Sequence, residues 1–290
     1  MTAPREPIEL IPAERQALWR WPAVLNFVFG GAGAGLYLTA ALAAGGGPSP
    51  AVTVASWLAP VLVLAGFAAV ATEAGRPLRG PRVLARLRTS WMSRELWVGG
   101  AFVVLAGAEL LVPSAALRAL AGLAAVALAL AQGFILRHAR AIAAWDVPVM
   151  PLVFLASAAL SGAGLFGLVE AAGGRTPGAP VLGALMLLCV LGALVWLAFV
   201  TWSREAAFAR ATRSLREGPV AVAIVGGGYL APFLLLGLAL ALPELALPAV
   251  TLGGAALILG QVQAKSALIL AAGELRPITL THLSLERRSS

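Results

Sequence analysis

The feature that most constrains the fold of this chain is its series of long apolar runs. Windows of spanning length occur at 21–44, 51–72, 95–113, 115–136, 149–172, 180–203, 220–242 and 247–272. A bilayer core about 30 Å thick accepts a helix of roughly 20 apolar residues, whereas one soluble core in a chain of 290 residues could not bury all of these runs. Since 60% of the residues are hydrophobic and 12% are charged, we expect an all-α polytopic membrane protein with eight transmembrane helices.

The first 20 residues are typical of a polar tail rather than of a cleaved signal. They mix Arg5, Arg15 and Arg20 with three glutamates, and they contain no apolar stretch of the length that a signal peptide needs. The first apolar run begins only at Trp21. We therefore expect this run to be a retained membrane helix that also serves as the insertion signal.

The arginines predict the orientation of the helices. Of the 21 basic residues, 18 lie in the two tails and in alternate connections between windows, while the opposite connections hold only Arg118 and Arg175. Because basic residues are enriched on the cytoplasmic side, we expect both termini in the cytoplasm of a multi-pass protein of a bacterial cytoplasmic (inner) membrane. Most tryptophans, Trp145 among them, fall at helix ends on this side, where we expect them to anchor in the interface. Topology thus explains the net charge of +8, and no nucleic-acid partner is expected.

A shift of 129 residues aligns features of the two halves of the chain. It places Gly33-Ala34-Gly35-Leu36 over Gly162-Ala163-Gly164-Leu165, and the window boundaries follow roughly the same shift. A chain rich in Ala, Gly and Leu also gives such matches by chance, so both explanations stay open. The repeat predicts an N-terminal tail (1–20), two similar four-helix units (21–140 and 141–273) that point the same way, and a C-terminal tail (274–290).

The scarcity of cysteine and histidine limits the metal chemistry of the chain. Cys189 is the one cysteine, so neither an intrachain disulfide nor a cysteine-ligated iron–sulfur cluster can form. The two histidines are His138 and His282, whereas a two-haem membrane cytochrome with bis-histidine ligation needs four. We therefore expect no haem, no iron–sulfur cluster and no other metal cofactor in this chain.

Polar residues mark the ends of the first two windows on the basic side. Asn26 lies five residues after Trp21, and a buried amide must find a partner. It either forms a hydrogen bond between helices or donates one to a quinone carbonyl. Glu73 ends the second window, and Arg76 follows three residues later. The two form either an interfacial ion pair or a proton-carrying carboxylate with an arginine that sets its electrostatics.

Other polar residues allow two interpretations each. Lys265 lies about seven residues inside the end of the last window, so it either faces the bundle interior or snorkels to the interface. His138 closes the fourth window, where it either exchanges protons near neutral pH or is structural. Glu109 and Glu170 approach the opposite face, where they serve a proton path or end helices.

The run Gly31-Ala32-Gly33-Ala34-Gly35 lies inside the first apolar window. A phosphate-binding glycine loop would have to follow a strand, and no strand precedes this run. Gly31 and Gly35 are instead typical of a small-xxx-small surface on which helix backbones approach closely. The glycines at 226–228 have the same interpretation.

Four segments carry motifs of a known family. They are Trp21-Pro22 with Asn26-Phe27 and Gly31 to Leu36, Glu73 to Leu78, Arg88-Thr89-Ser90-Trp91-Met92-Ser93-Arg94-Glu95, and Trp145-Asp146-Val147-Pro148. In these segments the chain resembles the NrfD-like membrane anchors, which include the anchors of polysulfide and dimethyl sulfoxide reductases. The resemblance covers most of the chain, and the arginine-rich run at 88–95 is its most specific part.

This resemblance implies an eight-helix subunit that binds a quinone or quinol, menaquinone or ubiquinone, near one membrane face, as in anaerobic respiration. A docked ferredoxin-like iron–sulfur subunit would connect it to a molybdopterin catalytic subunit. Asn26 matches the polar residue at the family's quinone, and Glu73 with Arg76 matches an acidic and arginine pair after the second helix. The loop 79–94 would dock the partner, which we then expect on the cytoplasmic side.

The chain departs from the family pattern at one place in the expected quinone site. Position 30 is glycine, whereas some relatives carry a quinone-bonding histidine there. A different side chain must then supply the bond, and we consider His138 or Lys265 for this role. Two functions of other classes remain as alternatives. A secondary transporter also has tandem helical repeats and an intramembrane lysine, and a structural tether would bind no quinone.

Overall fold

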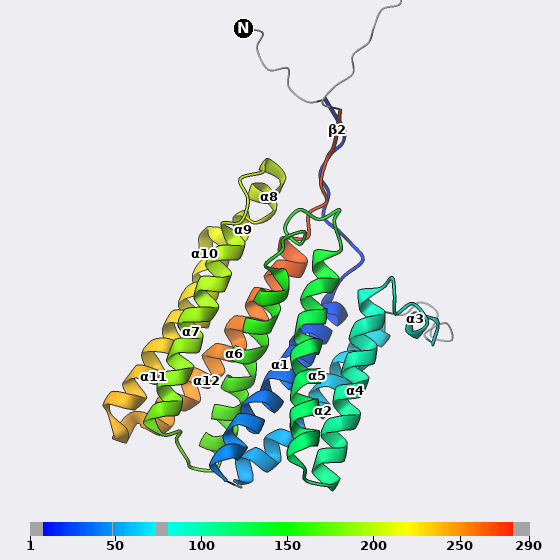
Figure 1. Cartoon of the computed structure of the whole chain (residues 1–290). Coiled ribbons are helices and arrows are strands. Elements are labelled where there is room, and N and C mark those ends of the chain that lie inside the picture. The colour runs from blue at the N-terminus through cyan, green and yellow to red at the C-terminus, as the bar shows by residue number, and fades with distance from the viewer. Residues whose placement is uncertain (1–7, 48, 74–80, 281–290) are drawn as a thin grey trace, which may run out of the picture.

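The computed structural model describes residues 8–47, 49–73 and 81–280, which form a bundle of long helices with a β-ribbon at one end (Figure 1). The long helices are α1 (Trp21–Ala43), α2 (Pro50–Ala71), α4 (Trp91–Leu111), α5 (Ala115–Arg137), α6 (Met150–Ala172) and α7 (Ala179–Val200), then α10 (Gly218–Val222) continued by η3 (Ala223–Leu230) and α11 (Ala231–Ala241), and finally α12 (Ala246–Ser266) continued by η5 (Ala267–Ala271). Short elements join them: η1 (Ala44–Gly46), α3 (Pro81–Leu84), α8 (Ala206–Ala211), α9 (Arg213–Arg216) and η4 (Pro243–Leu245). Helix α1 packs against α2, α5, α6 and α12.

The all-α polytopic fold predicted from the apolar windows is confirmed. Among the described residues, seven helices are long and apolar enough to cross a membrane. The remaining long helix, α4, has 21 residues, carries Arg94, Glu95 and Glu109, and packs along α5. The expected number of eight spans is therefore close to the seven found by length and composition.

Helix α4 begins four residues before the apolar window that predicted it. The Ser90 hydroxyl caps the helix by accepting a hydrogen bond from the Ser93 backbone N–H at 3.4 Å, as serine commonly does at a helix N-terminus. Charged residues in the first turns hid this start from an apolar scan. As a result Glu95 lies inside the bundle rather than at its border.

Glycines allow α1 and α6 to cross in backbone contact. A β-carbon on Gly35 would overlap the Ala158 carbonyl of α6, and one on Gly162 would overlap Gly35 itself. The close-packing role predicted for Gly35 is thus confirmed. Among the glycines of η3, Gly228 has the same role, because its β-carbon would stand 2.9 Å from the Cα of Gly260 in α12.

The β-ribbon joins the two ends of the chain. Strand β1 (Ile8–Ile11) pairs antiparallel with β2 (Ile278–Leu280), with Ile8 opposite Leu280. Pairing continues toward the bundle, where the Gln16 N–H donates to the Gly273 carbonyl at 2.8 Å. Both described ends therefore leave the bundle on the same side, as Figure 1 shows. The ribbon was not predicted, because strands of four and three residues are too short to show a period.

One tryptophan expected at the interface lies in the core instead. Trp145 is 1% exposed, and its indole N–H donates to the Leu268 carbonyl at 2.9 Å. The Trp19 ring lies 5.0 Å from the Trp145 ring, and Ile142 forms a β-bridge with Leu275, so the segment after α5 is packed into this end of the bundle. The interpretation of Trp145 as a membrane anchor is therefore wrong. Trp21 and Trp97 are more than half exposed and Trp202 is half exposed, as membrane anchors would be.

Candidate functional site

The beginning of α1 brings a polar side chain into the bundle. Pro22 occupies the first turn, where a missing N–H has no cost. One turn later Asn26 is buried, with 3% of its surface exposed, between α2, α4 and α5. Gly66 of α2 permits this burial, because a β-carbon there would stand 3.0 Å from the Asn26 carbonyl oxygen.

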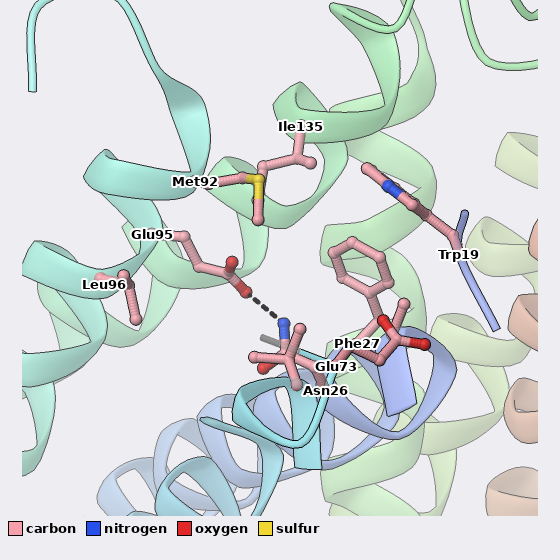
Figure 2. A pocket seen from close by; sticks show the side chains of 10 residues that line it. Trp19, Asn26, Phe27, Glu73, Met92, Glu95, Leu96 and Ile135 are labelled. Carbon is pink, nitrogen blue, oxygen red and sulfur yellow. Dashed lines mark hydrogen bonds between the residues drawn. The ribbon is translucent and has the colours of Figure 1, made fainter. Parts of the chain in front are cut away.

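Asn26 belongs to a buried cluster of three polar side chains. Its Nδ2 donates to Oε1 of Glu95 at 2.9 Å, drawn as a dashed line in Figure 2. Gln132 of α5 donates from Nε2 to the same Glu95 oxygen at 3.1 Å and also to the Asn26 carbonyl at 3.3 Å. Hydrogen bonds to a carboxylate are stronger than those between neutral groups, so Glu95 holds the three helices in register. For Asn26, the structure thus shows an interhelical hydrogen bond.

The cluster occupies the space that a side chain at position 30 would need. A β-carbon on Gly30 would overlap Nε2 of Gln132. The glycine that departs from the family pattern is therefore paired with a glutamine that reaches across from α5. Neither His138 nor Lys265 fills that space.

A pocket of about 90 Å³ opens beside this cluster (Figure 2). Its polar lining residues are Asn26, Glu73 and Glu95, and the rest of its wall is formed by Trp19, Ala23, Phe27, Val70, Met92, Leu96 and Ile135. The second Glu95 oxygen makes no hydrogen bond to a described residue, and in Figure 2 it is directed away from Asn26. An apolar cavity with a few converging polar groups is the usual form of a small-molecule site.

Glu73 lies at the outer edge of the same pocket. It is exposed, follows the end of α2, and its Oε1 accepts a hydrogen bond from the Arg20 backbone N–H at 3.3 Å. Asn26 and Glu73, which the sequence placed on one membrane face, thus both line this pocket. Arg76, predicted as the partner of Glu73, lies outside the described residues.

Lys265 lies on the other side of α1, away from this pocket. It is 3% exposed, and its Nζ donates to the Phe27 carbonyl at 2.8 Å. Gly31 makes room for it, because a β-carbon there would stand 2.6 Å from that Nζ. Of the two positions considered, the structure shows the bundle interior, and snorkelling is wrong.

His138 is exposed at the end of α5 and also lies outside the pocket. The Trp91 indole N–H donates to its Nε2 at 3.2 Å, so the proton of the neutral ring is on Nδ1, 3.0 Å from the Phe134 carbonyl. The Trp91 ring stacks on Phe134 at 4.3 Å, and Arg94 covers Trp91 at 4.2 Å. These contacts fix the start of α4 against α5.

Glu109 and Glu170 each form an ion pair with an arginine at the opposite end of the bundle. Glu109 forms an ion pair with Arg118 at 2.8 Å, and Glu170 forms one with Arg175 at 2.7 Å. Each glutamate stands near the end of one helix, and its arginine follows in the next connection or helix. Of the two interpretations considered, these contacts agree with helix ends.

Sequence reasoning missed Glu95 and Gln132 as site residues. Glu95 is the last residue of the motif at 88–95 and the first residue of an apolar window, so its position in the sequence is typical of a helix end rather than of a buried site. Gln132 is a lone amide inside an apolar run, which is the same signal that identified Asn26. A search for every uncharged polar residue within the windows would have found it.

Fold and site together define a polytopic helical membrane protein with a polar pocket between α1, α2, α4 and α5. A sequence model of the DMSO reductase anchor subunit family (DmsC) matches residues 15–188, a range that includes every described residue of the pocket. The chain belongs to this family, and is thus a membrane anchor that associates with catalytic oxidoreductase subunits. A search of curated proteins gives no match.

Proposed function

We propose that this anchor binds a quinone or quinol in the pocket beside Glu95 and exchanges electrons with a docked iron–sulfur subunit of a molybdopterin oxidoreductase. The observation that carries the proposal is the pair of carboxylates in one pocket, Glu95 buried and Glu73 exposed. When bound, a quinol supplies two electrons and two protons. The electrons need a neighbouring redox protein, and the protons need acceptors in this chain.

The residues of the pocket fit such a ligand. Its walls are apolar and aromatic, which suits a lipid-soluble ring with a long tail. Two buried oxygens of the cluster, Asn26 Oδ1 and Gln132 Oε1, have no hydrogen-bond partner within the described part of the chain. Buried polar atoms are almost always paired, so these atoms leave hydrogen-bonding capacity beside the pocket. Asn26 then offers an acceptor to a quinol hydroxyl, since its N–H already binds Glu95.

The two carboxylates have different tasks in this proposal. Glu95 accepts a proton inside the pocket through the oxygen that is not held by Asn26 and Gln132. Glu73, which is exposed to water, passes protons on to the aqueous side. Arg76 sets the electrostatics of Glu73. We assign no quinone contact to His138 or Lys265, because neither lines the pocket.

The loop 79–94 is the proposed docking surface for the redox partner. In its described part, the Arg94 guanidinium donates to the Leu87 carbonyl at 3.0 Å and the Arg88 carbonyl at 2.8 Å, which fixes the loop at the start of α4. Met92 belongs to the same segment and lines the pocket. A partner seated on this loop would therefore approach the quinone site closely. The positive-inside rule puts this side in the cytoplasm of a bacterial inner membrane.

We expect Glu73→Gln to lower quinol-coupled turnover by roughly 10- to 100-fold, at or below the lower end of the range of about 100- to 10,000-fold for a positioned acid or base, because water can partly replace an exposed carboxylate. The complex should still assemble, because the Glu73 side chain is exposed and holds only one backbone N–H. Turnover is measured with a soluble quinol and the purified complex, and assembly by gel filtration. Glu244→Gln is the control, since Glu244 is also exposed near a helix end but lies at the opposite face. Full turnover in assembled Glu73→Gln complex would exclude the proton role.

The identity of co-purifying subunits separates this proposal from the other classes. The detergent-solubilised anchor should bring down one subunit with iron–sulfur clusters and one with molybdenum. A stable solitary chain that moves a solute across liposomes would indicate a secondary transporter. A complex whose turnover responds to no quinone analogue would indicate a structural tether.

A further inference from the structure

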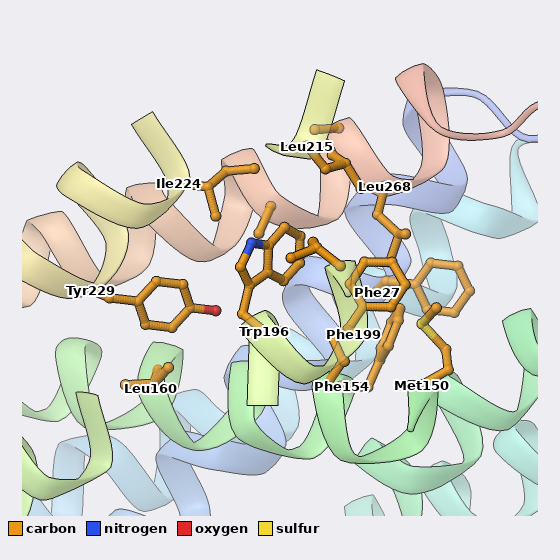
Figure 3. Packing of buried hydrophobic residues seen from close by; sticks show 14 of the residues in the cluster. Phe27, Met150, Phe154, Leu160, Trp196, Phe199, Leu215, Ile224, Tyr229 and Leu268 are labelled. Carbon is orange, nitrogen blue, oxygen red and sulfur yellow. The ribbon is translucent and has the colours of Figure 1, made fainter. Parts of the chain in front are cut away.

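A second, smaller cavity lies in the other half of the bundle. It lies between α6, α7, α12 and η5, has a volume of about 10 Å³, and is separate from the pocket at Glu95. Its polar lining residues are Ser157, Trp196, Gln261 and Lys265, and the others are apolar. Figure 3 shows the Trp196 indole among buried apolar side chains, with the Tyr229 hydroxyl directed toward it.

Three of the lining side chains have a buried atom without a partner. Ser157 Oγ, Trp196 Nε1 and Gln261 Nε2 find no hydrogen bond among the residues that the structure describes. The three side chains belong to residues that are only 4%, 3% and 2% exposed. An unpaired polar atom in an apolar interior is costly, and three around one cavity are better explained by a shared ligand.

Lys265 adds a fourth donor to the same cavity. An ammonium group has three N–H donors, and the structure gives it one acceptor, the Phe27 carbonyl. Lys265 therefore borders the cavity with one N–H already bonded to α1.

The size of the cavity limits that ligand to one small molecule. A volume of about 10–15 Å³ by this measure holds one water, and a buried water needs two to four polar partners. Water accepts two hydrogen bonds, here from the Trp196 and Gln261 N–H groups, and it can donate one to Ser157 Oγ. The shift of 129 residues places Gln132 over Gln261, so each half of the chain has a glutamine at the corresponding helical position facing a polar space.

We infer that this cavity is a binding site for a single structural water, held by Ser157, Trp196 and Gln261 next to Lys265. The water completes the hydrogen bonds of these three side chains, while Lys265 stays bonded to the Phe27 carbonyl. The inference does not depend on quinone binding. It predicts that Trp196, although buried, has a water molecule as a neighbour.

X-ray radiolysis with mass spectrometry tests this directly, because it oxidises side chains next to ordered internal water. Trp196 should be oxidised several-fold faster than Trp145, which is equally buried but donates its N–H to the Leu268 carbonyl. In Gln261→Met, whose side chain has similar length and lacks the amide, the Trp196 rate should fall toward that of Trp145. Equal rates for the two tryptophans in the unmodified protein, or an unchanged Trp196 rate in the variant, would overturn the inference.

A pair of serine variants gives an independent measurement. If Ser157 bonds to a water, Ser157→Ala should lower the melting temperature by roughly 2–4 °C, the effect of about one lost hydrogen bond. In a dry cavity the same change would remove an unpaired hydroxyl and leave the melting temperature unchanged or higher. Ser161→Ala is the control, because Ser161 lies one turn further along α6, is also 4% exposed, and already donates to the Ser157 carbonyl at 2.7 Å. A fall in Ser157→Ala comparable to that in Ser161→Ala is expected, and no fall in Ser157→Ala while Ser161→Ala falls contradicts the site.

Discussion

Glu95→Gln should lower quinol-coupled turnover by about 100-fold or more, which is the largest catalytic effect expected of any single change in this chain. The substitution keeps the size of the side chain but removes the charge that binds the Asn26 and Gln132 amides and the proposed acceptor of a proton in the pocket. The measurement is the turnover of the purified complex with a soluble quinol. Fluorescence titration with a quinone analogue should show weaker binding in the same variant.

The matched control for this prediction is Glu109→Gln. Glu109 lies on the same helix α4 and is also buried, at 6% exposure, but it pairs with Arg118 at the far end of the bundle. Its loss should affect stability and leave quinol turnover unchanged. If Glu95 and Glu73 act in series, the double variant should be no slower than Glu95→Gln alone, because residues that act as a unit are not additive. Full turnover in Glu95→Gln would rule out its role in the pocket.

Gly35→Ala should be the most destabilising of the small substitutions. Its β-carbon would overlap the Ala158 carbonyl, so α1 and α6 would have to move apart along their crossing. Overpacking of this kind costs about 3 kcal/mol, which corresponds to a fall of roughly 6–12 °C in melting temperature. The thermal unfolding of the detergent-solubilised protein measures this fall.

A control on another helix separates the backbone contact from a general effect of replacing glycine. Gly100 in α4 has no atom within 4 Å of the position of its β-carbon. Gly100→Ala should therefore be neutral or stabilise by up to about 1 kcal/mol, the difference in helix propensity. Equal melting temperatures for the two variants would mean that α1 and α6 are not in backbone contact.

Much of the fold was predictable because spanning length is a local property of the sequence. Each apolar window became a helix, with ends that moved by a few residues. The start of α4 moved most, since Ser90 caps the helix ahead of Arg94 and Glu95, and a scan for apolar residues cannot see a cap. The ribbon of β1 and β2 was missed because it joins residues at opposite ends of the chain.

The sequence by itself determined that this chain lies in a membrane, and it identified Asn26 and Glu73 as polar residues at one face. Only the tertiary structure decided what they meet. Glu95 and Gln132 lie 69 and 106 residues from Asn26 along the chain, and glycines at 30 and 66 let their helices close around it. The sequence likewise left open whether Lys265 faces lipid or protein, and the packing of α12 against α1 places its side chain inside the protein. The partner of a buried polar group depends on which helices are neighbours, and that follows from contacts between distant residues rather than from the pattern within any one helix.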